Sequence, residues 1–383
     1  MPVSSDRSAT TLQGSQLRIA MFSDAIPDRN GVGTYYRDLG IHLADSVERV
    51  KLFCPQQDAS GTWRDPVRLP LPGDSTQRIC IPNPLELRRQ YKKLDPQAVV
   101  LSTPGPYGFI GLRLARKAGA RIIVGFHTNL EKLTELYWQE SRGFGRLSKW
   151  YLERGHQKLF RHASAVLANS GPMAEIAEKI GAHDVDVMGT TIAPPFINKP
   201  ISPLREELSI VTFAGRLATE KNLESIISAA TTIPEIQFRI AGDGPQRELV
   251  GTAASSIGNL TYLGWQPRTR MPDLIDETDM LVLPSHVESF GTIALEAMTR
   301  NRSVLVSRNC GITHWKNLSP GLYKIGADET LADAILRVAS LNPTVRRQKA
   351  QLARESACAL NEWTVNHWLD VLSGSTMASP QNV

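Results

Sequence analysis

Short runs of apolar residues recur along nearly the whole chain, and stretches with helical spacing separate them. The runs are continuous in Val, Ile and Leu, which is typical of parallel strands that are buried on both faces. They predict strands at 17–24, 50–55, 98–104, 121–128, 164–170, 208–216, 236–244, 260–265, 279–285 and 303–309. This alternation of strands and helices predicts open, doubly wound α/β sheets.

The spacing between the strands predicts helices at 33–44, 109–118, 173–180, 222–230, 268–275, 291–299 and 330–340. The segment 193–207 contains four prolines and has no periodicity, so we place a domain boundary there. We expect a polar, disordered tail at 1–16, one Rossmann-like domain at 17–195 and a second at 196–360. A last helix with a polar tail is expected within 361–383.

Composition narrows the classes of protein that fit. A chain of 383 residues with 42% hydrophobic residues suits two globular domains. The chain has no apolar run long enough to span a membrane and no signal-peptide core at its start, so we expect a cytoplasmic protein. The four cysteines lack metal-ligand spacing. A net charge of +5 allows an anionic partner: a membrane surface, nucleic acid or a phosphorylated substrate.

Charged residues and glycines follow the strands of the second half. Ligands of open α/β sheets bind at the carboxyl ends of strands, so these residues are the candidates for function. Arg216 and Lys221 follow one strand and can bind a diphosphate through charge-assisted hydrogen bonds. A solvated loop with a lysine at a helix start explains the pair equally well. Gly242, in GDGP, is a weaker signal, because a plain strand–helix turn also has this sequence.

Two glutamates bracket the next loop-to-helix junction, in ESFGTIALE from Glu288 to Glu296. The backbone N–H groups at such a helix start favour a bound phosphate. The residues of this start are Ser289, Phe290, Gly291 and Thr292. Glu296, in the second helical turn, can accept hydrogen bonds from a ribose diol. The alternative is one glutamate that complements the helix dipole and one on the surface.

The order and spacing of these motifs closely resemble retaining glycosyltransferases of the GT-B fold, family 4 in particular, in which two Rossmann-like domains flank an interdomain cleft. The shared motifs are NGVGTYYRDLGIHLA, HT at 127–128, VLANS, GRL-x3-K, AGDGP and LPS-x2-ESFGTIALEA. The resemblance implies that Arg216 and Lys221 hold the diphosphate of the donor. It also implies that Glu296 binds the ribose and that Glu288 contacts the donor sugar.

The resemblance assigns roles in the first half as well. The loop Gly31–Val32–Gly33 would approach the phosphate and the acceptor, His127 would lie near the transferred sugar, and the last helix would cross back to the first domain. A lone histidine after a buried strand is more often structural, but a position at the cleft favours a role in the site. The sequence has no Asp-x-Asp at a strand end, so we expect no metal, and no cofactor apart from the nucleotide sugar as substrate.

The chain departs from the family pattern in two places. Asn301–Arg302–Ser303 replaces the usual glycine and proline turn. In NCGITHW, Gly311 remains, but His314 and Trp315 follow where the family has an acidic residue. The second departure leaves the identity of the donor sugar open.

Basic and aromatic residues gather in the half of the chain that binds the acceptor in this family. One segment is 138–163, with Arg146, Lys149 and Trp150. The other is RRQYKK, which contributes Arg88, Arg89, Lys92 and Lys93. Such helices can lie on anionic membranes. A solvated amphipathic helix is the alternative for 138–163, since Phe144, Leu147, Tyr151 and Leu159 share one stripe.

We therefore expect a retaining, metal-independent transferase that moves a hexose from a UDP- or GDP-linked donor to a hydroxyl acceptor. A membrane lipid such as a diacylglycerol or phospholipid is slightly favoured, which would make the protein peripheral on the inner face of the membrane. A soluble sugar or polysaccharide acceptor, a nucleotide-sugar epimerase and an inactive nucleotide-binding module remain alternatives. We expect no nucleic-acid partner, and the sequence leaves the oligomeric state open.

Overall fold

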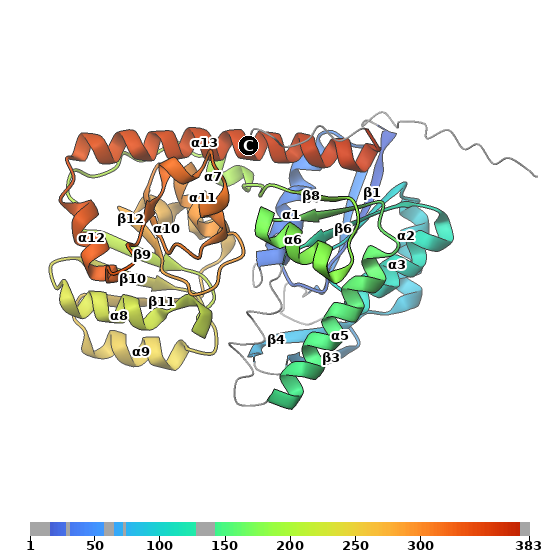
Figure 1. Cartoon of the computed structure of the whole chain (residues 1–383), viewed down its shortest axis with the longest axis horizontal. Coiled ribbons are helices and arrows are strands. Elements are labelled where there is room, and N and C mark those ends of the chain that lie inside the picture. Colours follow the sequence, from blue (N-terminus) through green and yellow to red (C-terminus); the bar gives the residue numbers. More distant parts are fainter. Residues whose placement is uncertain (1–15, 28–30, 57–64, 72–73, 128–141, 376–383) are drawn as a thin grey trace, which may run out of the picture.

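The computed structural model describes residues 16–27, 31–56, 65–71, 74–127 and 142–375. Apart from Gln16, the N-terminal tail that the sequence predicts lies outside these ranges, as do residues 376–383. The chain forms two α/β domains that lie side by side, and one long helix, α13 (Pro343–Ser373), runs along both (Figure 1). No helix in these ranges is both long and apolar enough to span a bilayer.

The N-terminal domain is built on a sheet with the strand order β2-β1-β5-β6-β7-β8, and all its strand pairs are parallel. Its strands are β1 (Arg18–Phe22), β2 (Arg49–Phe53), β5 (Ala98–Leu101), β6 (Arg121–Phe126), β7 (Ala165–Ala168) and β8 (Val185–Val187). Its helices are α1 (Gly31–Ala44), α2 (Pro84–Leu94), α3 (Pro106–Ala118), α5 (Arg142–Phe160) and α6 (Gly171–Ile180). The strand order reverses between β1 and β5, which makes this the topological switch point of the sheet.

The C-terminal domain repeats this plan, with the strand order β11-β10-β9-β12-β13-β14. Its strands are β9 (Ile210–Ala214), β10 (Gln237–Ala241), β11 (Leu260–Gly264), β12 (Met280–Leu283), β13 (Ser303–Val306) and β14 (Tyr323–Lys324). Its helices are α7 (Pro194–Asn198), α8 (Leu223–Thr232), α9 (Arg247–Ser256), α10 (Met271–Asp276), α11 (Thr292–Thr299) and α12 (Leu331–Ala339). Short 3-10 turns are η2 (Thr219–Lys221), η3 (Arg268–Arg270), η4 (Gly311–His314) and η5 (Ser319–Gly321). Here the switch point lies between β9 and β12.

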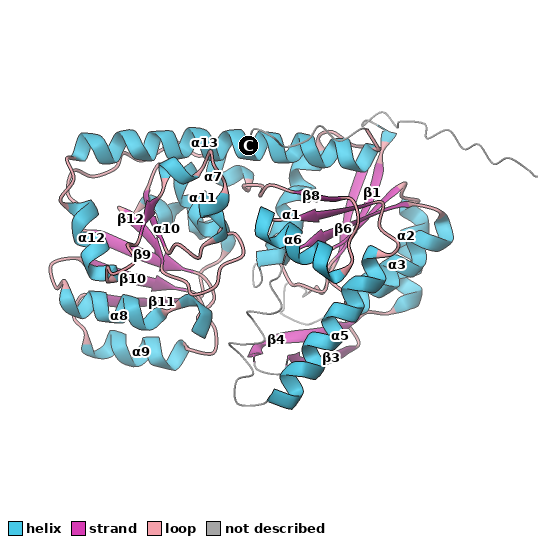
Figure 2. Ribbon diagram, in the orientation of Figure 1, coloured by secondary structure: helices cyan, strands magenta, loops and turns pink. Residues whose placement is uncertain are grey.

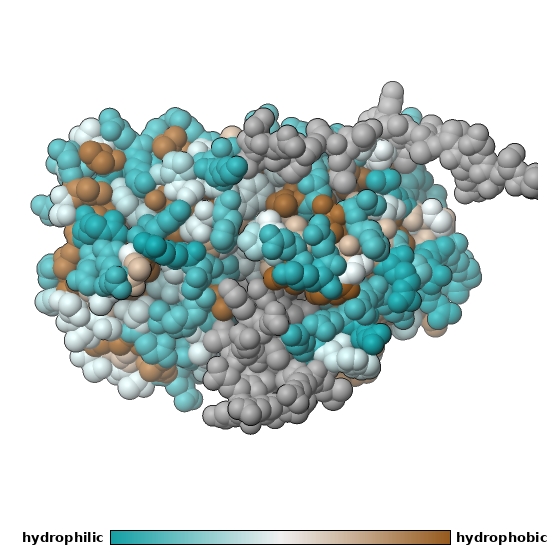
Figure 3. Space-filling view, in the orientation of Figure 1, coloured by the Kyte–Doolittle hydropathy of each residue, from teal (hydrophilic) through white to brown (hydrophobic). Residues whose placement is uncertain are grey.

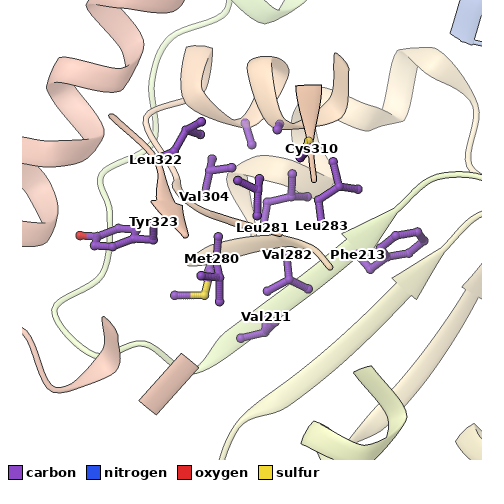
Figure 4. Close-up of a cluster of buried hydrophobic side chains, with 14 of the residues drawn as sticks. Val211, Phe213, Met280, Leu281, Val282, Leu283, Val304, Cys310, Leu322 and Tyr323 are labelled. Carbon is purple, nitrogen blue, oxygen red and sulfur yellow. The ribbon is translucent and has the colours of Figure 1, made fainter. Parts of the chain in front are cut away.

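Helices cover both faces of each sheet, which explains why the strands read as continuous apolar runs (Figure 2). All four residues of β12 are buried, and their side chains point alternately to the two faces of the sheet. On these faces they join a core that includes Val211, Phe213 and Val304 (Figure 4). The predicted fold class is therefore confirmed, and each predicted strand is present with somewhat shorter bounds.

The last helix begins far earlier than the sequence suggests. We expected it after residue 360, whereas α13 begins at Pro343, where the side chain of Asn342 caps the helix by accepting from the Thr344 N–H. The first part of α13 packs on the C-terminal core through Ala353 and Ala357. Its last turns enter the N-terminal core, in which Trp368 is fully buried.

The sequence prediction lacks the short edge strands β8 and β14, the helix α9 and one antiparallel hairpin outside the parallel sheets. Strands β3 (Val67–Leu71) and β4 (Asp74–Ile81) form an antiparallel hairpin at the lower edge of the N-terminal domain in Figure 1. Its apolar residues alternate with polar ones, so no continuous run marks either strand.

The departure at Asn301 leaves the turn between α11 and β13 intact. Asn301 has a φ of 60°, the left-handed conformation that glycine adopts most easily. Its neighbours Arg300 and Arg302 are buried and donate hydrogen bonds to main-chain carbonyls of the segment 196–203. Asp276 neutralises Arg300 at 2.7 Å. The two arginines thus fasten the interdomain segment to the C-terminal domain.

Candidate active site

The predicted diphosphate residues lie at the switch point of the C-terminal sheet. Arg216 and Lys221 follow β9, and Glu288 follows the neighbouring strand β12. The backbone N–H of His286 donates to the carbonyl of Glu220 at 2.8 Å, which ties the two strand-end loops together. Open α/β sheets bind their ligands at such switch points, outside the carboxyl ends of the strands.

Both cations are held by carboxylates. Lys221 Nζ lies 2.5 Å from Glu288 Oε2, and Arg216 Nη2 lies 2.5 Å from Glu220 Oε1. The Lys221–Glu288 pair joins two of the residues singled out from the sequence, 67 positions apart. Lys221 and Glu288 are both only slightly exposed, so each holds the side chain of the other in place.

Glu296 lies in α11 and is 1% exposed. Arg268 Nη1 lies 2.5 Å from Glu296 Oε1, and Arg268 Nη2 lies 2.8 Å from Asp38 Oδ2. Asp38 belongs to α1, so this chain of ion pairs connects the two domains. Burial raises the pKa of Glu296, while the nearby Arg268 acts in the opposite direction. The sequence analysis missed Arg268, although its position shortly after β11 could have marked it.

Glycines let the loops of this site approach one another closely. The Gly311 N–H donates to the Glu288 carbonyl at 2.9 Å, and a Cβ at Gly311 would lie 1.9 Å from the Ser289 oxygen. Gly242, with a φ of 144°, approaches the Gly215 oxygen in the same way, because a Cβ there would lie at 1.8 Å. Phe290 is buried, so only its backbone could meet a ligand.

The loop NCGITHW, which departs from the family pattern, lies against this site. Trp315 is buried and packs on Phe290 with ring centroids 6.2 Å apart, whereas His314 is exposed. The Ile312 N–H donates to the Phe290 carbonyl at 2.8 Å. His314 therefore does not take the place of the missing acidic residue inside the loop.

In the N-terminal domain, Gly31, Val32 and Gly33 form the first turn of α1. Asp24, which follows β1, accepts hydrogen bonds from Thr103 Oγ1 at 2.6 Å and from the Tyr107 N–H at 2.8 Å. These bonds tie the carboxyl ends of β1 and β5 together at the switch point. They also give a backbone N–H in the first turn of α3 its hydrogen-bond acceptor. Asp24 is therefore a structural residue that the sequence analysis did not single out.

His127 follows β6 and packs among aromatic side chains. Its Nε2 lies 2.8 Å from the Tyr36 hydroxyl, and its ring centroid is 5.0 Å from that of Tyr35. Tyr35 is in turn held by Trp368 of α13, whose Nε1 donates to the Tyr35 hydroxyl at 2.7 Å. Burial lowers the pKa of His127 to about 3, so its ring is neutral near pH 7.

Because the His127 ring is buried in its neutral form, we expect the protein to lose stability in acid. The ordinary pKa of 6.5 applies in the unfolded chain, so between this value and about 3 the unfolded chain binds a proton that the folded protein does not. The free energy of unfolding should therefore fall as the pH drops through this range. In His127→Asn this decline should be shallower, as measured by denaturant unfolding at several pH values. His183→Asn changes an exposed histidine and should follow the native protein; equal slopes for all three proteins would contradict the assignment.

The predicted acceptor or membrane residues lie on the surface of the N-terminal domain rather than in the strand-end loops. Arg88, Arg89, Lys92 and Lys93 form the exposed face of α2, which buries Leu87, Tyr91 and Leu94. On α5, Trp150 is 55% exposed and Lys149 Nζ lies 3.9 Å from Glu153.

The stripe expected on α5 is not one buried face. Tyr151 is 52% exposed, whereas Leu159 is buried. The side chains of Phe144, Arg146 and Leu147 lie outside the described part of the structure, as does residue 128 of the HT motif. In the described ranges, no group of three or more His, Cys, Asp or Glu side chains is placed to hold a metal ion.

Two family models match consecutive parts of the chain. Residues 29–193 match the model described as Glycosyltransferase Family 4, and residues 196–355 match Glycosyl transferases group 1. The boundary between them falls inside the segment that the sequence predicts as the domain boundary.

Curated relatives and a solved structure resemble the chain. An α-D-kanosaminyltransferase of Streptomyces kanamyceticus is 31% identical over 39% of this chain, and the match spans 40% of its own length. A D-inositol 3-phosphate glycosyltransferase of an Arthrobacter strain is 24% identical over 75% of this chain and 76% of its own. The structure of Anabaena Alr3699/HepE in complex with UDP and glucose, 15% identical, superposes with a TM-score of 0.67 and covers 92% of this chain and 99% of that one.

The two matched models together span nearly all of both domains, and their order along the chain is that of the two sheets. The paired cations at the switch point and the two glutamates of α11 and its preceding loop occupy the strand ends where such domains bind ligands. The chain therefore belongs to the glycosyltransferases of the GT-B fold, with a family 4 domain followed by a group 1 domain.

Proposed function

We propose that the protein is a retaining glycosyltransferase that moves a hexose from a nucleotide diphosphate sugar to a hydroxyl acceptor. The observation that carries this proposal is the grouping of Arg216, Lys221 and Glu288 on the two strands that flank the switch point. Two cations suit the diphosphate, and a carboxylate beside them suits the hydroxyl groups of the sugar.

The chemistry requires charge stabilisation at the leaving group. The bond between the anomeric carbon and the diphosphate oxygen breaks, and positive charge develops on the sugar while negative charge develops on the diphosphate. Arg216, Lys221 and the backbone N–H groups at the start of α11 would stabilise the diphosphate. The acceptor oxygen bonds to the same face of the anomeric carbon, and its proton passes to the departing phosphate. No separate carboxylate base is needed.

Glu288 and His127 would position the sugar in this scheme. Glu288 is already fixed by Lys221, so its free oxygen can accept from sugar hydroxyls without further ordering. The neutral ring of His127 can form hydrogen bonds without placing a second positive charge beside the developing one.

The test is a panel of UDP- and GDP-linked hexoses with labelled sugar, incubated with bacterial lipid extract or with soluble sugars. Transfer of label with retention at the anomeric centre supports the proposal. Conversion of the sugar in the absence of any acceptor would identify an epimerase instead. If neither labelled product nor free nucleoside diphosphate forms with any donor, the proposed function is wrong. HepE, crystallised with UDP and glucose, makes UDP-glucose the first donor to try.

For the acceptor we favour a membrane lipid, because the hairpin exposes an apolar face. Val67 pairs with Ile81 and Leu69 pairs with Ile79, so these four side chains share one face. They are 37% to 51% exposed. Three residues after β4, α2 begins and adds the 76% exposed Leu85.

Along the chain the hairpin is followed by α2, whose exposed face carries Arg88, Arg89, Lys92 and Lys93. Where Figure 3 colours the surface, hydrophilic residues predominate and hydrophobic ones form small groups. Exposed apolar residues together with exposed lysines and arginines suit the interface of an anionic bilayer. This arrangement supports a lipid acceptor that the enzyme reaches at the membrane surface.

Charge reversal on α2 is expected to weaken binding to vesicles. Lys93→Glu should reduce the partition coefficient for vesicles that contain phosphatidylglycerol by at least about fivefold, since each basic residue near an anionic surface contributes about 1 kcal/mol and the new carboxylate is repelled. Lys179→Glu makes the same change at an exposed site on α6 and serves as the matched control. Leu69→Ser should weaken binding to neutral and anionic vesicles alike. Equal sedimentation of native protein with and without anionic lipid would remove the lipid hypothesis.

A further inference from the structure

Arg268 occupies a position that neither the family motifs nor the proposed chemistry explains. It lies in η3, after β11, and its guanidinium meets groups from three different elements. It pairs with Glu296 of α11 and with Asp38 of α1, and it lies over the ring of Phe196 in α7, with 4.7 Å between the guanidinium carbon and the ring centroid. Its side chain is 18% exposed.

The partners of Arg268 are more deeply buried than the arginine itself. Glu296 and Asp38 are each 1% exposed. A buried carboxylate without a cation is strongly destabilised in its charged form, and Arg268 counteracts the rise in the pKa of Glu296 that burial causes. Asp38 also pairs with Arg37, at 3.0 Å. The planar guanidinium can serve two carboxylates at once from separate nitrogens, which a lysine cannot do with the same geometry.

We propose that Arg268 is a positioning residue of the donor site, which holds the Glu296 carboxylate ionised and oriented for the ribose of the nucleotide. This inference rests on the proposed function, in which Glu296 receives the ribose diol. Through Asp38 the same guanidinium fixes Glu296 relative to α1, whose first turn is Gly31–Val32–Gly33. The side chain of Arg268 thereby sets the position of Glu296 relative to the start of α1.

The alternative is that Arg268 competes with the ribose for Glu296. Only one nitrogen of Arg268 faces Glu296 Oε1, and a carboxylate has acceptor sites on both oxygens, so the pair can persist while a diol binds. The two cases predict opposite changes in affinity when the arginine is removed.

The test is calorimetric titration with UDP, GDP and ADP, each as the free nucleotide. Arg268→Gln should weaken binding of the preferred nucleotide by about tenfold near neutral pH, because a buried charged group loses its partner. Arg270→Gln removes a neighbouring arginine of η3 that pairs with Glu277 at 2.7 Å, and it should bind as the native protein does.

The pH dependence separates positioning from a merely structural role. Arg268, Asp38 and Arg37 are the charged groups that act on Glu296. With Arg268 gone, Glu296 takes up a proton more readily, and a protonated carboxyl accepts fewer hydrogen bonds. The affinity of Arg268→Gln should therefore fall more steeply than that of the native protein as the pH is lowered. Arg268→Lys, which restores a positive charge, should largely restore the native profile.

The outcomes distinguish the inference from the proposed function. If the native protein binds none of the three nucleotides, the proposed function fails. If the native protein binds one and Arg268→Gln binds it equally well with the same pH profile, the positioning role is wrong. Tighter binding by Arg268→Gln would overturn the inference in favour of competition. Glu296→Gln, whose side chain cannot ionise, should bind weakly at every pH, and native affinity in this variant would also contradict the role of Arg268.

Discussion

Lys221→Ala is expected to lower kcat/KM for glycosyl transfer by about 10²- to 10³-fold, the usual cost of removing one group that stabilises a developing anion. Lys221 is 15% exposed and ion-paired, so its ammonium is already fixed before the diphosphate develops charge. The substitution also leaves Glu288 without its cation, and the carboxylate would then repel the leaving diphosphate. Both effects act on the transition state, so we expect most of the loss in kcat rather than in KM.

A matched control is available on the same domain. Lys199 forms an ion pair with Asp273 of α10 rather than with a residue of the loops after β9 or β12, and Lys199→Ala should leave transfer kinetics nearly unchanged. The double variant Lys221→Ala/Glu288→Ala removes both members of the active-site pair. If repulsion by Glu288 contributes, the double variant should lose less than the product of the two single losses. Native kcat in Lys221→Ala would show that the diphosphate lies elsewhere.

The strand-end residues could be predicted from the sequence, because the strands of a parallel sheet all end at the same edge. Each continuous apolar run ends at the same edge of a sheet, so Arg216, Lys221 and Glu288 could be placed on one edge without any knowledge of their contacts. Their pairing could not be predicted. Nothing in the sequence indicates that Lys221 meets Glu288 or that Arg216 meets Glu220, since these contacts depend on how the loops fold over the sheet.

Arg268 was missed for a different reason. It meets Asp38, 230 positions away, across the boundary between two domains. The local sequence QPRTRMPDL predicts a helix over 268–275, and the structure instead has the 3-10 turn η3 before the short helix α10. The position of Arg268 shortly after β11 marks it as a candidate, but an arginine in such a turn suits the protein surface equally well. Only the arrangement of the domains shows that its guanidinium joins two buried carboxylates.

The pattern of apolar residues also failed to predict the early part of α13. Its buried apolar residues there are small, namely Ala350, Ala353 and Ala357, and the other buried residue of this part is the charged Arg346. Small residues give a weak hydrophobic signal, while the later turns with Trp368 and Leu372 give a strong one. The helix therefore looked as if it began where its large apolar residues begin.

A glycine at the start of α1 sets how close that helix comes to β1. A Cβ at Gly33 would lie 2.6 Å from the carbonyl carbon of Ile26 and 2.7 Å from the nitrogen of Pro27. These are backbone atoms, so no side-chain rotation can relieve the contact. At Gly40, two turns later in the same helix, an added Cβ would meet no such neighbour within 4 Å.

Gly33→Ala should therefore lower the free energy of unfolding by about 3 kcal/mol, the upper range for an overpacked core. Since this turn would approach the donor and the acceptor, a shift of about 1 Å should also reduce kcat/KM by about 10²-fold. Gly40→Ala should instead raise the free energy of unfolding by about 0.5 to 1 kcal/mol, because alanine is favoured over glycine inside a helix, and leave kcat/KM unchanged. Denaturant unfolding and steady-state kinetics on the same preparations separate the two effects. Loss of stability without loss of activity in Gly33→Ala would mean that the start of α1 supports the fold but lies outside the site. If both glycine variants behaved alike, the close packing of α1 on the loop after β1 would be wrong.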